Sequence, residues 1–219
     1  EEESIGDTLT EISRGENVES IVVDGGSTDL TVMTAESQGA RVIRSRPGRA
    51  AQMNIGAGEA AAEILLFLHA DTRLPEGFDR RIRQALADPR IAGGAFRLHF
   101  DGKGAALRIV EWGANLRSRC LQLPYGDQSL FLWKADFRTA GGFPEIPIME
   151  DAVLVRTLRK QGRIVTLPQK AVTSARRYRR IGPLSAWLIN QFVVFCFFRG
   201  IDPNELARRY RGQEGLARW

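Results

Sequence analysis

Cysteine and histidine are scarce in this sequence of 219 residues. It has two cysteines, Cys120 and Cys196, and two histidines, with no CxxC pair and no Cys/His cluster. Disulfide frameworks and structural zinc sites need such clusters, so the composition argues against both and favours two free thiols in a reducing, cytoplasmic setting. Lysine is also scarce: only four of the 31 basic residues are lysine, and the rest are arginine, whose planar side chain suits phosphate and carboxylate groups.

A hydrophobic run long enough to span a bilayer is absent. The most apolar stretch, residues 186–198, contains Asn190 and Gln191 and falls short of the ~20 residues that a spanning helix needs. Four arginines between 176 and 180 precede it. The stretch therefore predicts either a helix in a membrane interface, beside a lipid-linked acceptor, or a helix buried on a sheet or in a homodimer contact.

Internal repeats, low-complexity tracts and linkers are absent as well, which favours a single domain over residues 1–219. Apolar, β-branched runs alternate with helical patterns, as is typical of an α/β fold with a mainly parallel central sheet flanked by helices. The patterns predict strands at 20–23, 40–43, 63–68, 94–100, 129–133 and 164–167, and helices at 4–13, 28–37, 49–62, 78–87, 107–121 and 151–161, followed by a helical, aromatic end.

Acidic side chains follow two of the predicted strands directly. Asp24 and the glycines after it follow one, and His69 and Asp71 follow another. Ligands of open α/β sheets bind outside the carboxyl ends of the strands. Asp24 is therefore predicted to bind a nucleobase or ribose, and Asp71 a Mg²⁺ or Mn²⁺ ion held together with substrate phosphates. His69 either contacts the ligand or is structural, and Ser27 and Asp29 are expected only to cap the next helix.

Two further acidic motifs lie later in the chain. Gly126, Asp127 and Gln128 form a flexible polar turn, and Glu150 and Asp151 open a predicted helix. Acids at a helix N-terminus stabilise the helix dipole, but a carboxylate there is also suited to act as a general base. A GxGxxG-like string at 56–61 is discounted as a dinucleotide site, because it lies within a predicted helix and ahead of the strand.

Six motifs in order resemble the family 2 glycosyltransferases: VVDGGSTD, RPGRAAQMNIGA, FLHADTRLP, PYGDQSLF, GGFPEIPIMEDAVLVRTLRKQG and VTSARRYRR. More narrowly, they resemble a bacterial subgroup labelled arsenosugar-biosynthesis glycosyltransferases. The similarity spans about residues 1–212. It implies a GT-A fold, in which residues 1–100 bind the nucleotide-sugar, 101–180 face the acceptor and 181–219 form a tail. It also implies a nucleotide-diphosphate sugar donor, with UDP favoured, and inversion at the anomeric carbon.

The resemblance assigns roles residue by residue. Asp24 and Gly25 fall at the nucleoside-binding position, and Asp71 falls on the last acid of the metal-binding DxD motif, where His69 replaces the first. Asp151 falls on the second acid of the ED motif, which is the presumed base. Gly126, Asp127 and Gln128 look like the acceptor-side loop. Apart from the resemblance, we expect Glu150 on the acceptor side as well, and we expect Arg49, Arg176 and Arg177 to add charge-assisted contacts to the diphosphate.

The family also begins with an apolar strand that is central in the sheet. No such strand is present before Glu1, so we expect a gap in the sheet, and roughly ten more residues upstream in the native chain. Two alternative functions stay open at this point. One is a sugar-phosphate nucleotidyltransferase, although a phosphate-binding loop is missing. The other is a noncatalytic, arginine-rich nucleic-acid-binding module, although the arginines are scattered rather than striped.

Overall fold

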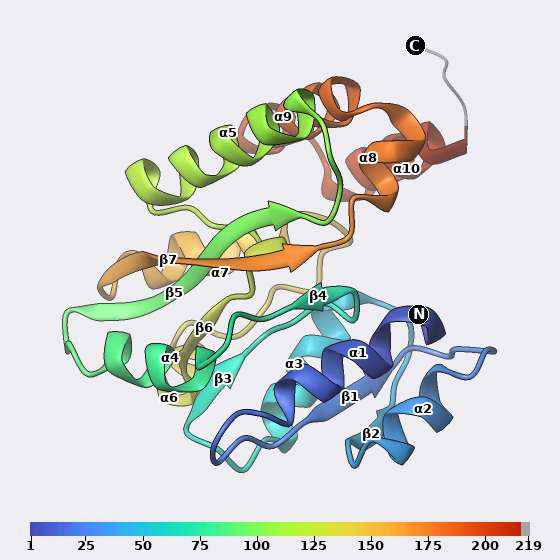
Figure 1. Ribbon diagram of the computed structural model, residues 1–219. Coiled ribbons are helices and arrows are strands. Elements are labelled where there is room, and N and C mark those ends of the chain that lie inside the picture. Colours follow the sequence, from blue (N-terminus) through green and yellow to red (C-terminus); the bar gives the residue numbers. More distant parts are fainter. Residues whose placement is uncertain (216–219) are drawn as a thin grey trace.

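The computed structural model describes residues 1–215 (Figure 1). Its first part is a pair of parallel strands, β1 (Ile21–Asp24) and β2 (Arg41–Arg44). Helices α1 (Glu2–Ile12) and α2 (Thr31–Ser37) pack together on one face of this pair, where Ile5 and Leu9 contact Val22. Helix α3 (Arg49–Glu59) covers the other face, where Gly56 lies against Val23. The alternation of Val22 and Val23 between the two faces is that of a strand buried on both sides.

A second sheet of five strands forms the centre of the molecule. Its order is β3-β6-β5-β7-β4. Only β5 and β7 run parallel in it, and the other three pairs are antiparallel. The strands are β3 (Ile64–Leu66), β4 (Thr72–Arg73), β5 (Ile91–Phe100), β6 (Phe131–Trp133) and β7 (Arg163–Thr173).

The predicted α/β class, with a central sheet flanked by helices, is confirmed. The expectation of mainly parallel pairing holds for β1 with β2 and for β5 with β7, and it is wrong for the other three pairs. Short apolar strands that are buried on both faces look the same in sequence whichever way their neighbours run. The pattern therefore indicated burial correctly and direction only in part.

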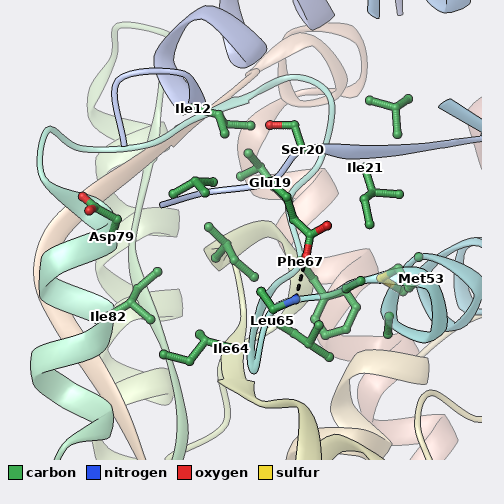
Figure 2. Close-up of a pocket in the computed structure, with 18 of the residues that line it drawn as sticks. Ile12, Glu19, Ser20, Ile21, Met53, Ile64, Leu65, Phe67, Asp79 and Ile82 are labelled. Atoms are coloured by element: carbon green, nitrogen blue, oxygen red, sulfur yellow. Dashed lines mark hydrogen bonds between the residues drawn. The ribbon is translucent and has the colours of Figure 1, made fainter. Parts of the chain in front are cut away.

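A groove separates the two sheets at the place where the sequence leads us to expect a gap. Among the described strands, β1 pairs only with β2, and the end strand β3 pairs only with β6. The volume of the groove is about 870 Å³. Figure 2 shows Ile21 of β1, Ile64 and Leu65 of β3, Ile12 of α1 and Met53 of α3 around it.

The two strands that border the groove run in the same direction. Glu19 Oε1, just before β1, accepts a hydrogen bond of 2.7 Å from the backbone N–H of Ala62, just before β3. The strands therefore start side by side, and their carboxyl ends point to the same edge of the molecule. Asp24 follows at the end of β1, and His69 and Asp71 follow β3.

The remaining helices form layers on the central sheet. Helix α4 (Phe78–Leu86) packs on one face against Phe96 and Phe131. Helix α7 (Glu150–Leu158) packs on the other face with α3 and with α6 (Lys134–Thr139). At the top of Figure 1, α5 and α9 lie next to each other, with α8 and α10 beside them. Their bounds are α5 (Ala105–Leu121), α8 (Arg176–Ile181), α9 (Pro183–Phe198) and α10 (Pro203–Gly215).

Most predicted elements are present within a few residues of their expected bounds. The strand predicted at 63–68 is shorter in the structure, where β3 covers only Ile64–Leu66. The strand predicted at 164–167 is longer, because it is part of the eleven-residue strand β7. Gly56 and Gly58 lie within α3, which confirms that the GxGxxG-like string is not a dinucleotide turn. Of the predicted tail, residues 216–219 lie outside the described part of the chain.

Candidate active site

Asp24 ends β1 as a buried residue whose carboxylate is held within its own turn. Its oxygens accept hydrogen bonds from the backbone N–H groups of Gly26 and Ser27, at 3.0 Å each. The hydrogen bonds from Ser27, aided by those from Gly26 and by Arg44, lower the pKa of Asp24, so the carboxylate stays charged at neutral pH. Asp24 therefore shapes the turn itself, and any contact with a nucleoside would be added to these bonds.

The start of α3 joins the end of β1 to the start of α7. Gln52 Nε2 donates a hydrogen bond of 2.7 Å to the carbonyl oxygen of Val23, and its amide packs against Gly25. One turn earlier, Arg49 Nη2 lies 2.8 Å from Glu150 Oε1. A charged side chain of α3 thus links two segments that are far apart in sequence. Nothing in the sequence pattern predicted the part that Gln52 plays.

Gly126 lies between His69 and Asp151. Its N–H donates a hydrogen bond of 2.7 Å to Asp151 Oδ2. A Cβ atom at position 126 would lie 3.2 Å from His69 Nε2 and 3.4 Å from Asp151 Oδ2. Because glycine lacks that atom, the imidazole and the carboxylate can approach the same backbone segment. Residues from the end of β3, from the 126–128 turn and from α7 therefore meet at one point.

Two buried carboxyl groups adjoin this point. Burial raises the pKa of Asp127, while Arg117, His69 and Arg49 act in the opposite direction. Burial also raises the pKa of Glu150, against the effect of its ion pair with Arg49. Desolvated carboxyl groups that interact with one another are typical of binding and catalytic clefts. The site therefore combines a partly exposed carboxylate, Asp151, with two carboxyl groups whose pKa is raised by desolvation.

The same segments contain strained backbone and buried polar atoms. Ser129 and Met149, which flank the turn and the start of α7, have φ angles of 56° and 69°. Non-glycine residues adopt such angles rarely, and they do so most often at functional sites. Within the part of the chain whose side chains are described, several buried polar atoms here have no hydrogen-bond partner: Tyr125 Oη, Asp127 Oδ1, Gln128 Oε1, Ser129 Oγ and Glu150 Oε2.

Leaving a buried polar atom unpaired costs about 1–3 kcal/mol, so such a concentration indicates a place where a polar ligand or water completes the bonding. These atoms belong to the segments for which the sequence predicts acceptor contacts, and the unpaired hydroxyl of Tyr125 lies in the same turn. The sequence pattern does not indicate a role for Arg117, whose guanidinium stacks 3.6 Å from the centre of the Tyr125 ring and is the main charge acting on Asp127.

Asp71 lies in a second, polar hollow of about 660 Å³. Arg73, Asp101 and Arg176 line it with Asp71, and so does Asp29 of the turn after β1. No group of three or more His, Cys, Asp or Glu side chains placed to hold a metal ion occurs among the described residues. Magnesium ions at nucleotide sites are commonly bound through one or two carboxylates together with substrate phosphates. Asp71 fits an ion of that kind, which arrives with its nucleotide.

The arginines predicted to contact a diphosphate differ in their surroundings. Arg49 is half-exposed beside Glu150, and Arg176 pairs with the carboxylate of Glu1 at 3.1 Å, at the rim of the Asp71 hollow. Arg177 instead donates a hydrogen bond to Asn190 of α9 and lies over the ring of Tyr210. Arg49 and Arg176 thus remain beside the predicted site, whereas Arg177 is engaged with the terminal helices.

The candidate residues therefore form two groups at one edge of the sheets. The first group contains His69, Gly126, Asp127, Glu150 and Asp151, and Arg49 links it to the end of β1. Asp71 and Arg176 lie in the polar hollow. No hydrogen bond or ion pair among the described residues joins the side chains of Asp24, Asp71 and Asp151. Their convergence on one bound ligand stays a prediction.

An α/β fold with polar groups gathered at the carboxyl edge of its strands is typical of nucleotide-binding enzymes. The family model of glycosyl transferase family 2 matches residues 1–133, and the chain belongs to this family. A sequence search of characterised proteins gave no match.

Solved structures with the same fold include enzymes in complex with nucleotide-sugars. The mannosyltransferase PcManGT from Pyrobaculum calidifontis, in complex with GDP-Man and Mn²⁺, superposes with a TM-score of 0.67 at 19% identity, over 99% of this chain and 67% of that one. Glucosyl-3-phosphoglycerate synthase from Mycobacterium tuberculosis, in complex with Mn²⁺ and UDP-glucose, superposes with a TM-score of 0.59 at 21% identity. The match covers 90% of this chain and 74% of that one. TarS of S. aureus gives 0.60 at 15% identity, over 94% of this chain but only 39% of TarS.

Proposed function

We propose that this family 2 glycosyltransferase transfers a sugar from a nucleotide-diphosphate sugar to an acceptor hydroxyl, with inversion at the anomeric carbon. The observation that carries the proposal is the meeting of His69, Gly126 and Asp151 beside the unpaired polar atoms of the 125–129 turn. Nucleotide-sugars bound to two of the structural neighbours support the donor class. Neither of the alternative functions drawn from the sequence has comparable support.

Asp151 acts as the general base in this proposal. Of its two oxygens, Oδ2 accepts from Gly126 N–H and Oδ1 from Ala152 N–H, which fixes the carboxylate in one orientation. A carboxylate fixed in this way keeps free lone pairs and can take the proton of the acceptor hydroxyl as the hydroxyl oxygen attacks the sugar. The unpaired atoms of Tyr125, Gln128 and Glu150 are buried near this carboxylate, where bound water would complete their hydrogen bonds.

Asp71 would hold a divalent ion, Mg²⁺ or Mn²⁺, which would offset the negative charge of the departing nucleotide. Two structural neighbours contain Mn²⁺, which supports this choice of ion. Arg49 and Arg176, at the borders of the two groups of residues, supply further positive charge for the phosphates. Asp24 and Gly25 complete the nucleoside end, with UDP as the favoured nucleotide. The arsenosugar subgroup and a cytoplasmic location remain predictions.

A thermal-shift screen of UDP- and GDP-sugars, with and without Mn²⁺, tests the proposal. A donor that binds only the folded chain should raise its stability by ~2.7 kcal/mol at 100 times its Kd, and the rise should require the metal. The matching nucleoside monophosphates, which lack the diphosphate, serve as controls and should give little metal-dependent shift. If no nucleotide-sugar stabilises the protein with either metal, the proposed donor class is wrong.

A further inference from the structure

The outer faces of α5 and α9 carry large apolar side chains that the fold leaves exposed. On α5 these are Ile109, Trp112 and Leu116, and on α9 they include Leu184, Leu188 and Phe195. The exposed fractions of Trp112, Leu188 and Phe195 are 66%, 60% and 56%. Spacings of three, four and seven residues place each set on one side of its helix. We call the combined surface the α5–α9 face.

The two helices form one continuous surface. A Cβ atom at Gly113 of α5 would lie only 3.7 Å from Trp187 Nε1 of α9, so the helices are close at that point. Helix α9 also buries Ala186, Val193 and Cys196 on its inner side. A helix at the surface of a protein in water normally has a polar outer face, whereas α9 is apolar on its outer face as well as on its inner face. A surface of this kind marks a site of interaction.

The charged residues along α8 and α9 are all basic, and on α5 the acid Glu111 is buried and pairs with Arg108. No Asp or Glu occurs between Asp151 and Asp202, a segment that contains all of α8 and α9. Exposed arginines lie at the two ends of α9, with Arg180 just before it and Arg199 just after it. An apolar face bordered by arginine is complementary to a membrane surface that contains anionic lipids. No helix in the described part of the chain is long and apolar enough to cross a membrane.

We propose that the α5–α9 face docks on an anionic lipid bilayer, with its apolar side chains in the interface and its arginines at the headgroups. A second copy of the chain is a poorer occupant, because a two-fold contact through this face would bring its arginines toward those of the partner. Phosphate headgroups neutralise the same charges. The face therefore fits a lipid surface better than it fits itself.

Docking in this orientation would place the membrane close to the active site. Val193 and Cys196, on the inner side of α9, pack against Ile148 and Met149, directly before Glu150, and Tyr125 packs on the same cluster. Helix α9 is thus one layer of side chains away from the acceptor-side residues. If the proposed function holds, a lipid-linked hydroxyl acceptor could reach the site from the bilayer. This last step rests on that function, but docking itself does not.

Flotation with vesicles tests the docking without requiring catalysis. The full chain should float with phosphatidylglycerol/phosphatidylcholine vesicles and not with pure phosphatidylcholine, and added salt should weaken the binding. The double variant Leu188→Ser/Phe195→Ser should bind at least ~10-fold more weakly, since two apolar side chains no longer enter the interface. The matched control is Leu30→Ser/Met33→Ser, which removes two side chains of similar exposure at α2 and should float like the parent.

Circular dichroism and gel filtration of each variant distinguish the outcomes. Loss of flotation in the folded α9 variant, with flotation kept in the α2 variant, supports the docking face. No flotation of the parent, or equal flotation of both double variants, overturns the proposal. A parent that is a dimer, and that becomes a monomer only in the α9 variant without binding vesicles, shows that a second copy covers this face instead. Donor binding in the thermal-shift screen is unaffected by any of these results, so the two proposals fail separately.

Discussion

Replacing Asp151 with asparagine should reduce sugar transfer by ~10²–10⁴-fold, the usual contribution of a general base, while donor binding is kept. Asparagine has nearly the same shape but cannot take a proton from the acceptor. It keeps one of the two acceptor oxygens that bond to Gly126 and Ala152, so a loss of about 1 kcal/mol in stability is expected and the fold should persist. Steady-state transfer with the donor identified by thermal shift measures the effect.

Asp136→Asn provides the matched control, because Asp136 also lies in the first turn of a helix, α6, away from the candidate site. This variant should transfer sugar at the normal rate. A folded Asp151→Asn protein with unimpaired turnover would show that another group removes the proton, and Asp151 would then be a helix-capping residue only.

Replacing Asp71 with alanine should remove the metal-dependent part of donor binding. Even groups that only support a metal ligand change affinity by ~10–100-fold when mutated, so loss of the ligand itself should weaken donor binding in the presence of Mn²⁺ by at least that factor. Binding without metal should change little. Calorimetric titration of the donor, with Mn²⁺ and with chelator, separates the two quantities.

Asp7 offers a control from the same surroundings, since it is exposed and lines the same polar hollow. Asp7→Ala changes the net charge by the same amount and should leave the titration unaltered. If Asp71→Ala and Asp7→Ala have the same effect on metal-dependent donor binding, the hollow acts only through its overall charge and Asp71 does not hold the ion.

The sequence predicted the local elements well because their signals are local. The run before Asp24 and the glycines after it indicated a strand that ends in a turn, and β1 ends at Asp24. The opening of a helix near Asp151 was equally clear, and α7 begins at Glu150. Both patterns depend on burial and on backbone preference over a few residues.

Strand pairing and contacts between distant segments were harder to predict. The two-residue strand β4 is too short to leave a pattern, and the antiparallel entry of β6 between β3 and β5 depends on the path of the whole chain. The contacts that assemble the site share this difficulty. The hydrogen bond from Gln52 to Val23 and the ion pair between Arg49 and Glu150 join residues that are far apart in sequence. The sequence around each of these residues has the pattern of an ordinary helix or turn.

Residue roles were predicted from order and resemblance, and the structure clarifies their surroundings. Asp127 reads as a polar turn residue in the sequence but is a buried carboxyl group whose pKa is raised. For His69 the sequence is compatible with either a ligand contact or a structural role, and in the structure its imidazole lies beside Gly126, close to Asp151. Burial and proximity of this kind depend on the packed fold, so a single sequence does not carry them.

A crystal structure with a nucleotide-diphosphate sugar and Mn²⁺ tests most directly whether Asp24, Asp71 and Asp151 serve one ligand. We expect the nucleoside near Asp24, the metal and diphosphate at Asp71, and the anomeric carbon of the sugar facing Asp151 beside Gly126. A nucleotide-sugar bound with its diphosphate away from Asp71, or with its sugar turned away from Asp151, would contradict this expectation.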